Sequence, residues 1–223
     1  QEYMNVAIIG SGSWATALAK IVMHNVTDIN WHIRRQEVID EFVEIRRNPN
    51  HLEWAYFDVS RIHFSADINA VIEQSDLLVL AVPSPYLKQT LNDITIDISN
   101  KLVISAVKGM IPDDNLLVTE YLHKHFNVPE ENLGVIAGPC HAEEIALERL
   151  SYLTVGCKDA TKALQWQKLF TTPYVYTTPS KDVEGLEYAS IMKNIYAIAA
   201  GICKSLKYGD NFQAVLISNA IQE

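Results

Sequence analysis

Two lysines stand where a positive charge could take part in chemistry. Lys108 follows the apolar run Leu102–Val107, which is typical of a buried strand. At the carboxyl end of a strand, its ammonium group could hold a phosphate or polarise a carbonyl. The alternative is an ordinary surface lysine at a strand exit, and its position alone leaves both open.

Lys193 is the second such lysine, in the middle of an apolar helical segment. Its helical neighbours three, four and seven positions away are all small: Ala189, Ser190, Ala197 and Ala200. A long side chain among small ones is expected to face a cavity or another backbone, and partial burial there suits a proton donor or acceptor. The alternative is a lysine whose stem packs while its head reaches water, and the spacing does not decide between the two.

A glycine-rich turn lies near the start of the chain, within Val6–Ala19. Gly10 permits a tight turn, Gly12 lets the backbone approach a pyrophosphate, and Ala15 replaces a third glycine while still allowing close helix–strand packing. Ser13 and Trp14 open the following helix, whose free N–H groups attract phosphate. The turn therefore predicts dinucleotide binding, with a purely structural glycine turn as the alternative.

The residues after the second apolar run bear on whether the cofactor is NADPH or NADH. Arg34 and Arg35 stand where an NAD site usually has an acidic residue, and the next acids are Glu37 and Asp40. Arginine can pair with a 2′-phosphate, so NADPH is a good candidate while NADH stays open. An exposed, solvated arginine pair is the alternative.

Two more turns are expected at strand ends. Pro83 closes an apolar run and either borders the nicotinamide ribose or simply ends the strand. Gly138, Cys140 and Ala142 belong to a turn that leads into a helix, which suits the approach of a phosphate or cofactor. Cys140 and His141 do not face each other on a helix, which disfavours a nucleophile pair. The histidines are scattered, and we expect no metal site.

The overall pattern alternates short apolar runs with helical segments, which indicates a parallel sheet covered on both faces. The expected strands are Val6–Ile9, Ile29–Ile33, Leu77–Val82, Leu102–Val107 and Leu133–Ala137, with Tyr152–Val155 and Tyr174–Tyr176 extending the sheet after Gly138. The expected helices are Trp14–His24, Glu37–Ile45, Ile68–Gln74 and Asn115–His125. The predicted fold is α/β, a Rossmann-type, doubly wound and mostly parallel sheet followed by the start of an all-helical, truncated domain.

The composition changes near Pro179 and Ser180, which we take as a junction. We expect residues 1–181 to form a dinucleotide-binding domain and 182–223 to begin a helical substrate domain, with a break near Tyr208–Asp210. The sequence stops within a helical pattern that has no glycine cap, and about 40 residues are few for a domain. We therefore expect this chain to be part of a longer protein.

Composition narrows the partner classes. The formal net charge is −9 and no basic run stands out, which argues against nucleic acid and anionic membranes as partners. We find no apolar run of the roughly 18–20 residues that a membrane helix needs. Three cysteines without a CxxC pair are typical of reduced thiols, so a cytoplasmic location is expected.

Five blocks in order along the chain resemble one family. They are IIGSGSWATALA, LAVPS, SAVKGM, AGPCHAEEIA and MKNIYAIAAGICKSLKYGDNFQAVLI. In them the chain resembles the NAD(P)-dependent sn-glycerol-3-phosphate dehydrogenases of the bacterial soluble type. The resemblance implies reduction of dihydroxyacetone phosphate, a small phosphorylated substrate, to sn-glycerol 3-phosphate for phospholipid synthesis. It also implies a homodimer.

The resemblance further implies residue roles. Lys193 matches the proton donor of the reduction, Asn194 would orient it, and Lys108 would contact both cofactor and substrate. With the residues argued above, the candidate cofactor set is Gly10, Gly12, Ser13, Trp14, Ala15, Arg34, Arg35, Pro83, Lys108 and Ala142. The candidate substrate set is Lys108, Gly138, Cys140 and Lys193.

The chain also departs from the family pattern. Cys140 stands where serine or threonine is common, and a thiol is a weaker hydrogen-bond partner than a hydroxyl. The family's further aspartate and Arg-Asn pair would lie beyond Glu223. Two alternatives stay open: another Rossmann hydroxy-acid dehydrogenase with a helical second domain, or a dinucleotide-binding module without catalysis. Gly209–Asn211 favours the glycerol-phosphate enzyme.

Overall fold

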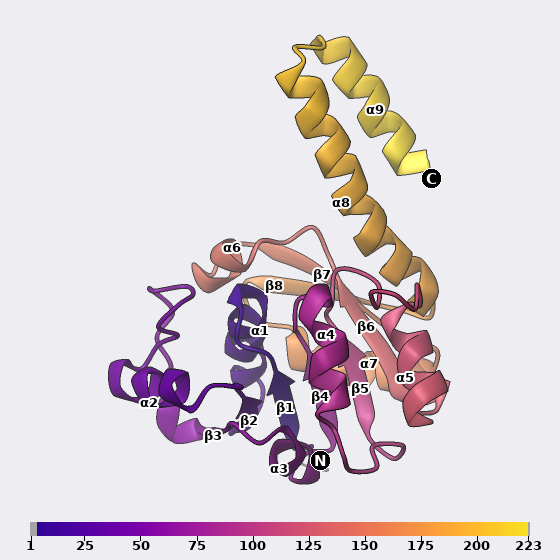
Figure 1. Ribbon diagram of the computed structural model, residues 1–223. Coiled ribbons are helices and arrows are strands. Elements are labelled where there is room, and N and C mark those ends of the chain that lie inside the picture. The colour runs from indigo at the N-terminus through magenta and orange to yellow at the C-terminus, as the bar shows by residue number, and fades with distance from the viewer. Residues whose placement is uncertain (1–3, 223) are drawn as a thin grey trace.

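A computed structural model describes residues 4–222, and it shows one twisted sheet from which a pair of helices projects (Figure 1). The strand order is β3-β2-β1-β4-β5-β6-β7-β8. The strands are β1 Val6–Ile9, β2 Ile29–His32, β3 Ile62–Ser65, β4 Leu77–Leu80, β5 Leu102–Ser105, β6 Leu133–Ala137, β7 Ser151–Cys157 and β8 Val175–Ser180. The order reverses direction between β1 and β4, and such a switch point is where open α/β sheets bind ligands.

The sheet is parallel except at one junction, where β7 runs antiparallel to β6. The neighbouring pairs from β3 through β6 are parallel, as is the pair of β7 and β8. This confirms the predicted Rossmann-type, mostly parallel fold and the extension of the sheet after Gly138.

Helices cover both faces of the sheet. They are α1 Ser13–Met23, α2 Gln36–Ile45, α3 Ile68–Glu73, α4 Ser84–Asn92, α5 Val118–Phe126, α6 Ala142–Ala146, α7 Ala160–Phe170, α8 Val183–Ser205 and α9 Asp210–Gln222. Apolar side chains of α1, α2, α6 and α7 pack on one face, and those of α3, α4 and α5 pack on the other. Successive strand residues point to opposite faces, so both halves of each central strand are apolar.

Several elements were not expected from the sequence. The edge strand β3 and the helices α4 and α7 lack a strong apolar period of their own, whereas α6 is the helix expected after the Gly138 turn. Pro83 and Pro85 suggested only a turn, whereas Pro83 caps α4 and Pro85 lies in its first turn, where proline is favoured. Pro179 lies inside the edge strand β8 rather than in a linker, and the helical region begins three residues after Ser180, at Val183.

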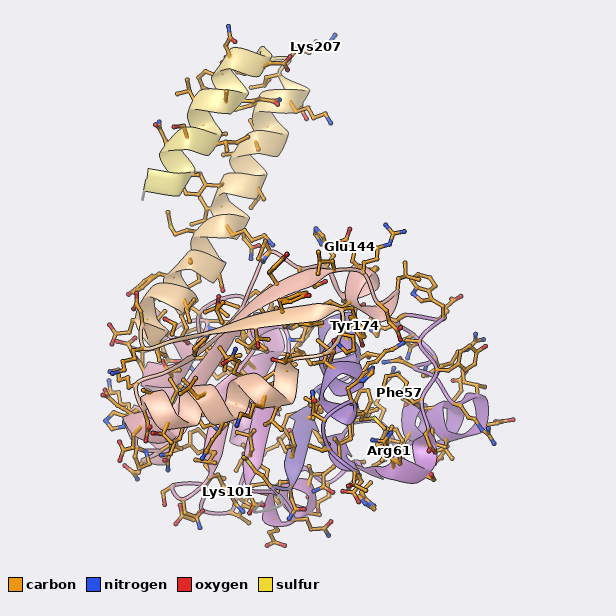
Figure 2. All side chains as sticks on the ribbon, turned by 180° about the vertical axis from the view of Figure 1, so that it is seen from behind. Phe57, Arg61, Lys101, Glu144, Tyr174 and Lys207 are labelled. Carbon is orange, nitrogen blue, oxygen red and sulfur yellow. The ribbon has the colours of Figure 1, made fainter. Side chains whose placement is uncertain are left out.

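The last two helices form a hairpin that rises from the sheet edge at the carboxyl ends of the parallel strands (Figure 1). Figure 2 labels Lys207 at its far tip and Glu144, on α6, at the edge from which it rises; Lys101, just before β5, lies at the opposite edge. Val183 and Leu186 pack the base of α8 on β6, while most of the hairpin is exposed. No helix among residues 4–222 is long and apolar enough to span a membrane.

Candidate active site

The glycine turn lies between β1 and α1, at the switch point of the sheet. Gly10 has φ +125°, and a Cβ there would lie 2.6 Å from the Ala81 carbonyl oxygen, so only glycine fits. Gly12 caps α1 without a side-chain partner, and a Cβ built on it meets nothing within 4 Å. Ala15 is fully buried against the sheet, as its place in the motif requires. The N-terminus of α1 therefore opens onto free space with its N–H groups available to a phosphate.

The segment after α2 holds the glycine turn in place. This supporting role was not predicted from the sequence. Asn48 is buried and its amide donates to the Ser11 carbonyl and to the Thr16 hydroxyl, both at 2.9 Å. The His51 ring lies 3.1 Å from the Ser13 hydroxyl. Asn48-Pro49-Asn50 signals a turn, but only the fold brings it to residues more than thirty positions earlier.

Arg34 and Arg35 follow β2 on the same side of the sheet. Both side chains are exposed, and Arg35 lies 3.7 Å from the Glu37 carboxylate. Their guanidinium groups are thus accessible to an anion placed beyond the end of β2, although Glu37 competes for Arg35. The preference for NADPH stays a prediction.

Lys108 is joined to the nucleotide turn through Trp14. Its ammonium lies 4.5 Å from the centre of the Trp14 ring, while the indole N–H donates to the Ala106 carbonyl at 3.1 Å. The same ammonium is 3.5 Å from the Cys140 carbonyl oxygen. Desolvation by the surrounding side chains lowers the pKa of Lys108, and the nearby positive charge of Lys193 lowers it further. These contacts place Lys108 at the centre of the candidate site.

The turn after β6 brings Gly138, Cys140 and Ala142 to the same edge. A Cβ at Gly138 would lie 2.4 Å from the Tyr152 carbonyl oxygen, so this position requires glycine. The buried Cys140 thiol donates to that carbonyl at 2.9 Å and is thereby held against β7. Cys140 can therefore reach the site through its carbonyl rather than its thiol. Ala142 begins α6 and is buried, and Pro83 is exposed at the start of α4.

Lys193 corrects one expectation from the sequence. It was a candidate for partial burial among small residues, but its side chain is exposed, as is that of Asn194. The reason is that α8 leaves the sheet beyond Glu187 and this part packs mainly against α9. Lys193 nevertheless lies near enough to Lys108 for its charge to lower the pKa of that lysine. Lys108 is thus within range of the charge of a lysine that is 85 positions away in the sequence.

We compared the chain with known protein families, relatives and solved structures. The family model described as NAD-dependent glycerol-3-phosphate dehydrogenase N-terminus matches residues 5–163. The chain belongs to the NAD-dependent glycerol-3-phosphate dehydrogenase family. The corresponding C-terminal model matches residues 182–223, so both parts of the family are represented.

Individual members of the glycerol-3-phosphate dehydrogenase family are similar over nearly the whole chain. The glycerol-3-phosphate dehydrogenases [NAD(P)+] of Bacillus pumilus and of an Exiguobacterium strain are 34% and 31% identical, over 98% of this chain and 64% of their own length. The chain thus spans less than two thirds of the length of these relatives. A solved structure of the Plasmodium falciparum glycerol-3-phosphate dehydrogenase matches with a TM-score of 0.88 and 28% identity, covering 98% of this chain and 64% of that one.

Proposed function

We propose that this chain carries the dinucleotide site and the catalytic lysine of an NAD(P)H-dependent enzyme that reduces dihydroxyacetone phosphate to sn-glycerol 3-phosphate. One observation carries the proposal. Lys108 is in contact with Trp14 of the glycine turn and under the electrostatic influence of Lys193. Nucleotide binding, positive charge and a proton-carrying lysine thus meet at one edge of the sheet.

The residues present fit a nicotinamide dinucleotide. The open space at Gly12 and the free N–H groups of α1 suit the pyrophosphate, beside Ser13, Trp14 and Ala15. Gly10 shapes the turn, Arg34 and Arg35 face the adenosine end, and Pro83, Lys108 and Ala142 would line the nicotinamide side. His51 joins this set because its ring contacts Ser13. The bound cofactor would supply the hydride.

The chain's own groups would supply charge, orientation and the proton. Lys108 would draw the phosphorylated substrate to the site, and the backbone of Gly138 and Cys140 would contact it. Lys193 would hold the proton that passes from its Nζ to the carbonyl oxygen of the substrate, with Asn194 orienting it. Two ammonium groups near one oxygen stabilise the negative charge that develops there.

The wider organisation of the protein follows from this role. We propose that residues 1–181 form the dinucleotide-binding domain and that 182–223 belong to a helical domain that completes the substrate site. The enzyme would work in the cytoplasm, as a homodimer, and feed phospholipid synthesis.

The test is oxidation of NADPH and NADH in the presence of dihydroxyacetone phosphate. It should be run on this 223-residue chain and on the complete product of its reading frame. We expect turnover by the complete product, poor turnover by the 223-residue chain, and cofactor binding by both. Cofactor binding with no turnover by either would favour a non-catalytic module, and turnover of a hydroxy acid instead would favour another Rossmann dehydrogenase.

Lys193→Ala tests the proton role. We expect about a 10²- to 10⁴-fold loss of the reduction rate with cofactor affinity nearly unchanged, because Lys193 lies away from the glycine turn. Lys207→Ala, at the tip of the same hairpin, is the matched control and should keep the rate. A retained rate in Lys193→Ala would assign Lys193 to the exposed helix surface.

A further inference from the structure

Glu187 is a buried carboxylate with no role in the chemistry described so far. It is 5% exposed, on α8, six residues before Lys193. One of its carboxylate oxygens accepts from the Thr119 backbone N–H at 3.2 Å, and the other accepts from the Thr119 hydroxyl at 2.5 Å. Both groups are in the first turn of α5, so Glu187 caps that helix from a distant part of the chain.

The surroundings of Glu187 make its charged form unfavourable. Burial raises the pKa of Glu187 to about 6, while the hydrogen bonds from Thr119 act in the opposite direction and the charge of Glu120 raises it further. On its own helix, the neighbouring Glu184 is exposed and pairs with Lys158 at 3.5 Å. A buried carboxylate that is held by hydrogen bonds rather than by a cation adds little net stability. This suggests that Glu187 serves to fix the geometry of the helix that carries it.

The position of Glu187 on α8 indicates which part of the geometry it fixes. Val183 and Leu186 pack against β6, and Leu186 lies close to Gly156 of β7. Glu187 is the last buried residue before α8 leaves the body of the protein. The orientation of the projecting part is therefore set at Glu187.

Lys193 is close to this anchor and would follow any change of its angle. Six helical residues span about 9 Å, so a tilt of about 10° at Glu187 would move the Lys193 backbone by about 1.5 Å. A displacement of this size at a reacting group can reduce a rate by about 100-fold.

We infer that the hydrogen-bonded pair of Glu187 and Thr119 is a positioning device that sets the distance between Lys193 and Lys108. The catalytic meaning of that distance rests on the proposed function; the geometric relation does not. Glu187 acts through α8 and touches no substrate.

The first test needs no catalysis. In the otherwise wild-type protein, the substitution Lys193→Gln should raise the pKa of Lys108, because it removes the neighbouring positive charge. This pKa is measured by NMR of labelled lysine side chains. In the Glu187→Leu/Thr119→Val background the effect of Lys193→Gln should largely disappear, because α8 no longer holds Lys193 near. Leucine and valine are similar in size to the residues they replace and remove the polar side-chain groups of both partners, so that only the Thr119 backbone N–H loses its acceptor. An undiminished effect in that background would overturn the inference.

Glu187→Gln and Thr119→Ser are the conservative variants. Both retain hydrogen bonding across the contact, so both should preserve most of the Lys193 effect on Lys108 and keep the inference testable if the apolar pair does not fold. Glu184→Gln removes a carboxylate one turn earlier and is the matched control, for which no change is expected.

The second test separates position from stability. With the complete protein, the apolar pair should lower kcat by about 10- to 100-fold at unchanged dinucleotide affinity. A merely structural role would lower thermal stability while the folded fraction kept its kcat, and this result would overturn the inference. If no variant or wild type reduces dihydroxyacetone phosphate, the proposed function fails, whereas the NMR result still stands or falls by itself.

Discussion

The ammonium of Lys108 lies 4.5 Å from the centre of the Trp14 ring. The ring belongs to the first turn of α1, while the lysine follows β5, so one contact links the nucleotide turn with the centre of the candidate site. A cation over an indole face is held by the ring quadrupole. Trp14 is in turn fixed by its hydrogen bond to the Ala106 carbonyl.

Trp14→Leu should weaken the use of substrate. Without the aromatic face, Lys108 loses an interaction of about 0.5–2 kcal/mol, which corresponds to roughly a 2- to 30-fold higher KM for dihydroxyacetone phosphate. Trp14→Phe keeps an aromatic face but loses the bond to Ala106, so an intermediate KM is expected. Cofactor affinity, measured separately by fluorescence titration, controls for damage to the turn. Equal KM values in all three proteins would show that the ring does not position Lys108.

Replacing both Arg34 and Arg35 by alanine should reduce NADPH affinity more than NADH affinity. A hydrogen bond to a charged phosphate contributes about 1.5–3 kcal/mol, so about a 10- to 100-fold selective loss is expected. Glu37→Gln is the companion variant: it removes the ion pair with Arg35 and should favour NADPH. Titration of each cofactor into the wild type and the two variants gives the six dissociation constants needed. Equal losses for both cofactors would mean that the arginines do not contact the 2′-phosphate.

Cys140→Ser should change little in KM. The thiol donates to the Tyr152 carbonyl, and a serine hydroxyl can make the same bond while the backbone carbonyl stays in place. Cys140→Val removes the donor and should lower the free energy of unfolding by about 1 kcal/mol. Cys203→Ser, on α8, is the control. A large fall of KM in Cys140→Ser would instead indicate that this side chain contacts substrate.

Glu187 should leave a signature in the pH dependence of stability. Its pKa is raised from 4.5 to about 6 in the folded protein, so between these values the folded state binds more protons than the unfolded state. Stability from this group is therefore present below about pH 4.5 and is lost as pH rises through 6, by about 2 kcal/mol in total. Urea unfolding at several pH values should show this loss for the wild type relative to Glu187→Gln. Parallel curves for the two proteins would contradict the assignment.

The sequence predicted the parts of the fold that have a strong local signal. The central strands are continuous apolar runs, and the glycine turn announces both its geometry and the open helix N-terminus that follows. Weakly patterned elements escaped prediction: β3 is a four-residue edge strand, and α4 begins among prolines that are equally typical of a turn. The predicted site residues stay predictions, although the fold brings Trp14, Lys108 and Cys140 into contact.

By itself the sequence determined which residues could do chemistry and that strand ends would carry most of them, because periodicity and glycine geometry are local properties. The tertiary structure decided which distant residues come into contact. His51 reaches Ser13, and Glu187 reaches Thr119 across 68 positions. It also decided burial: the small neighbours of Lys193 suggested a cavity, but burial depends on what packs against a helix. Contacts between distant segments depend on strand order and helix direction, which no short stretch of sequence encodes.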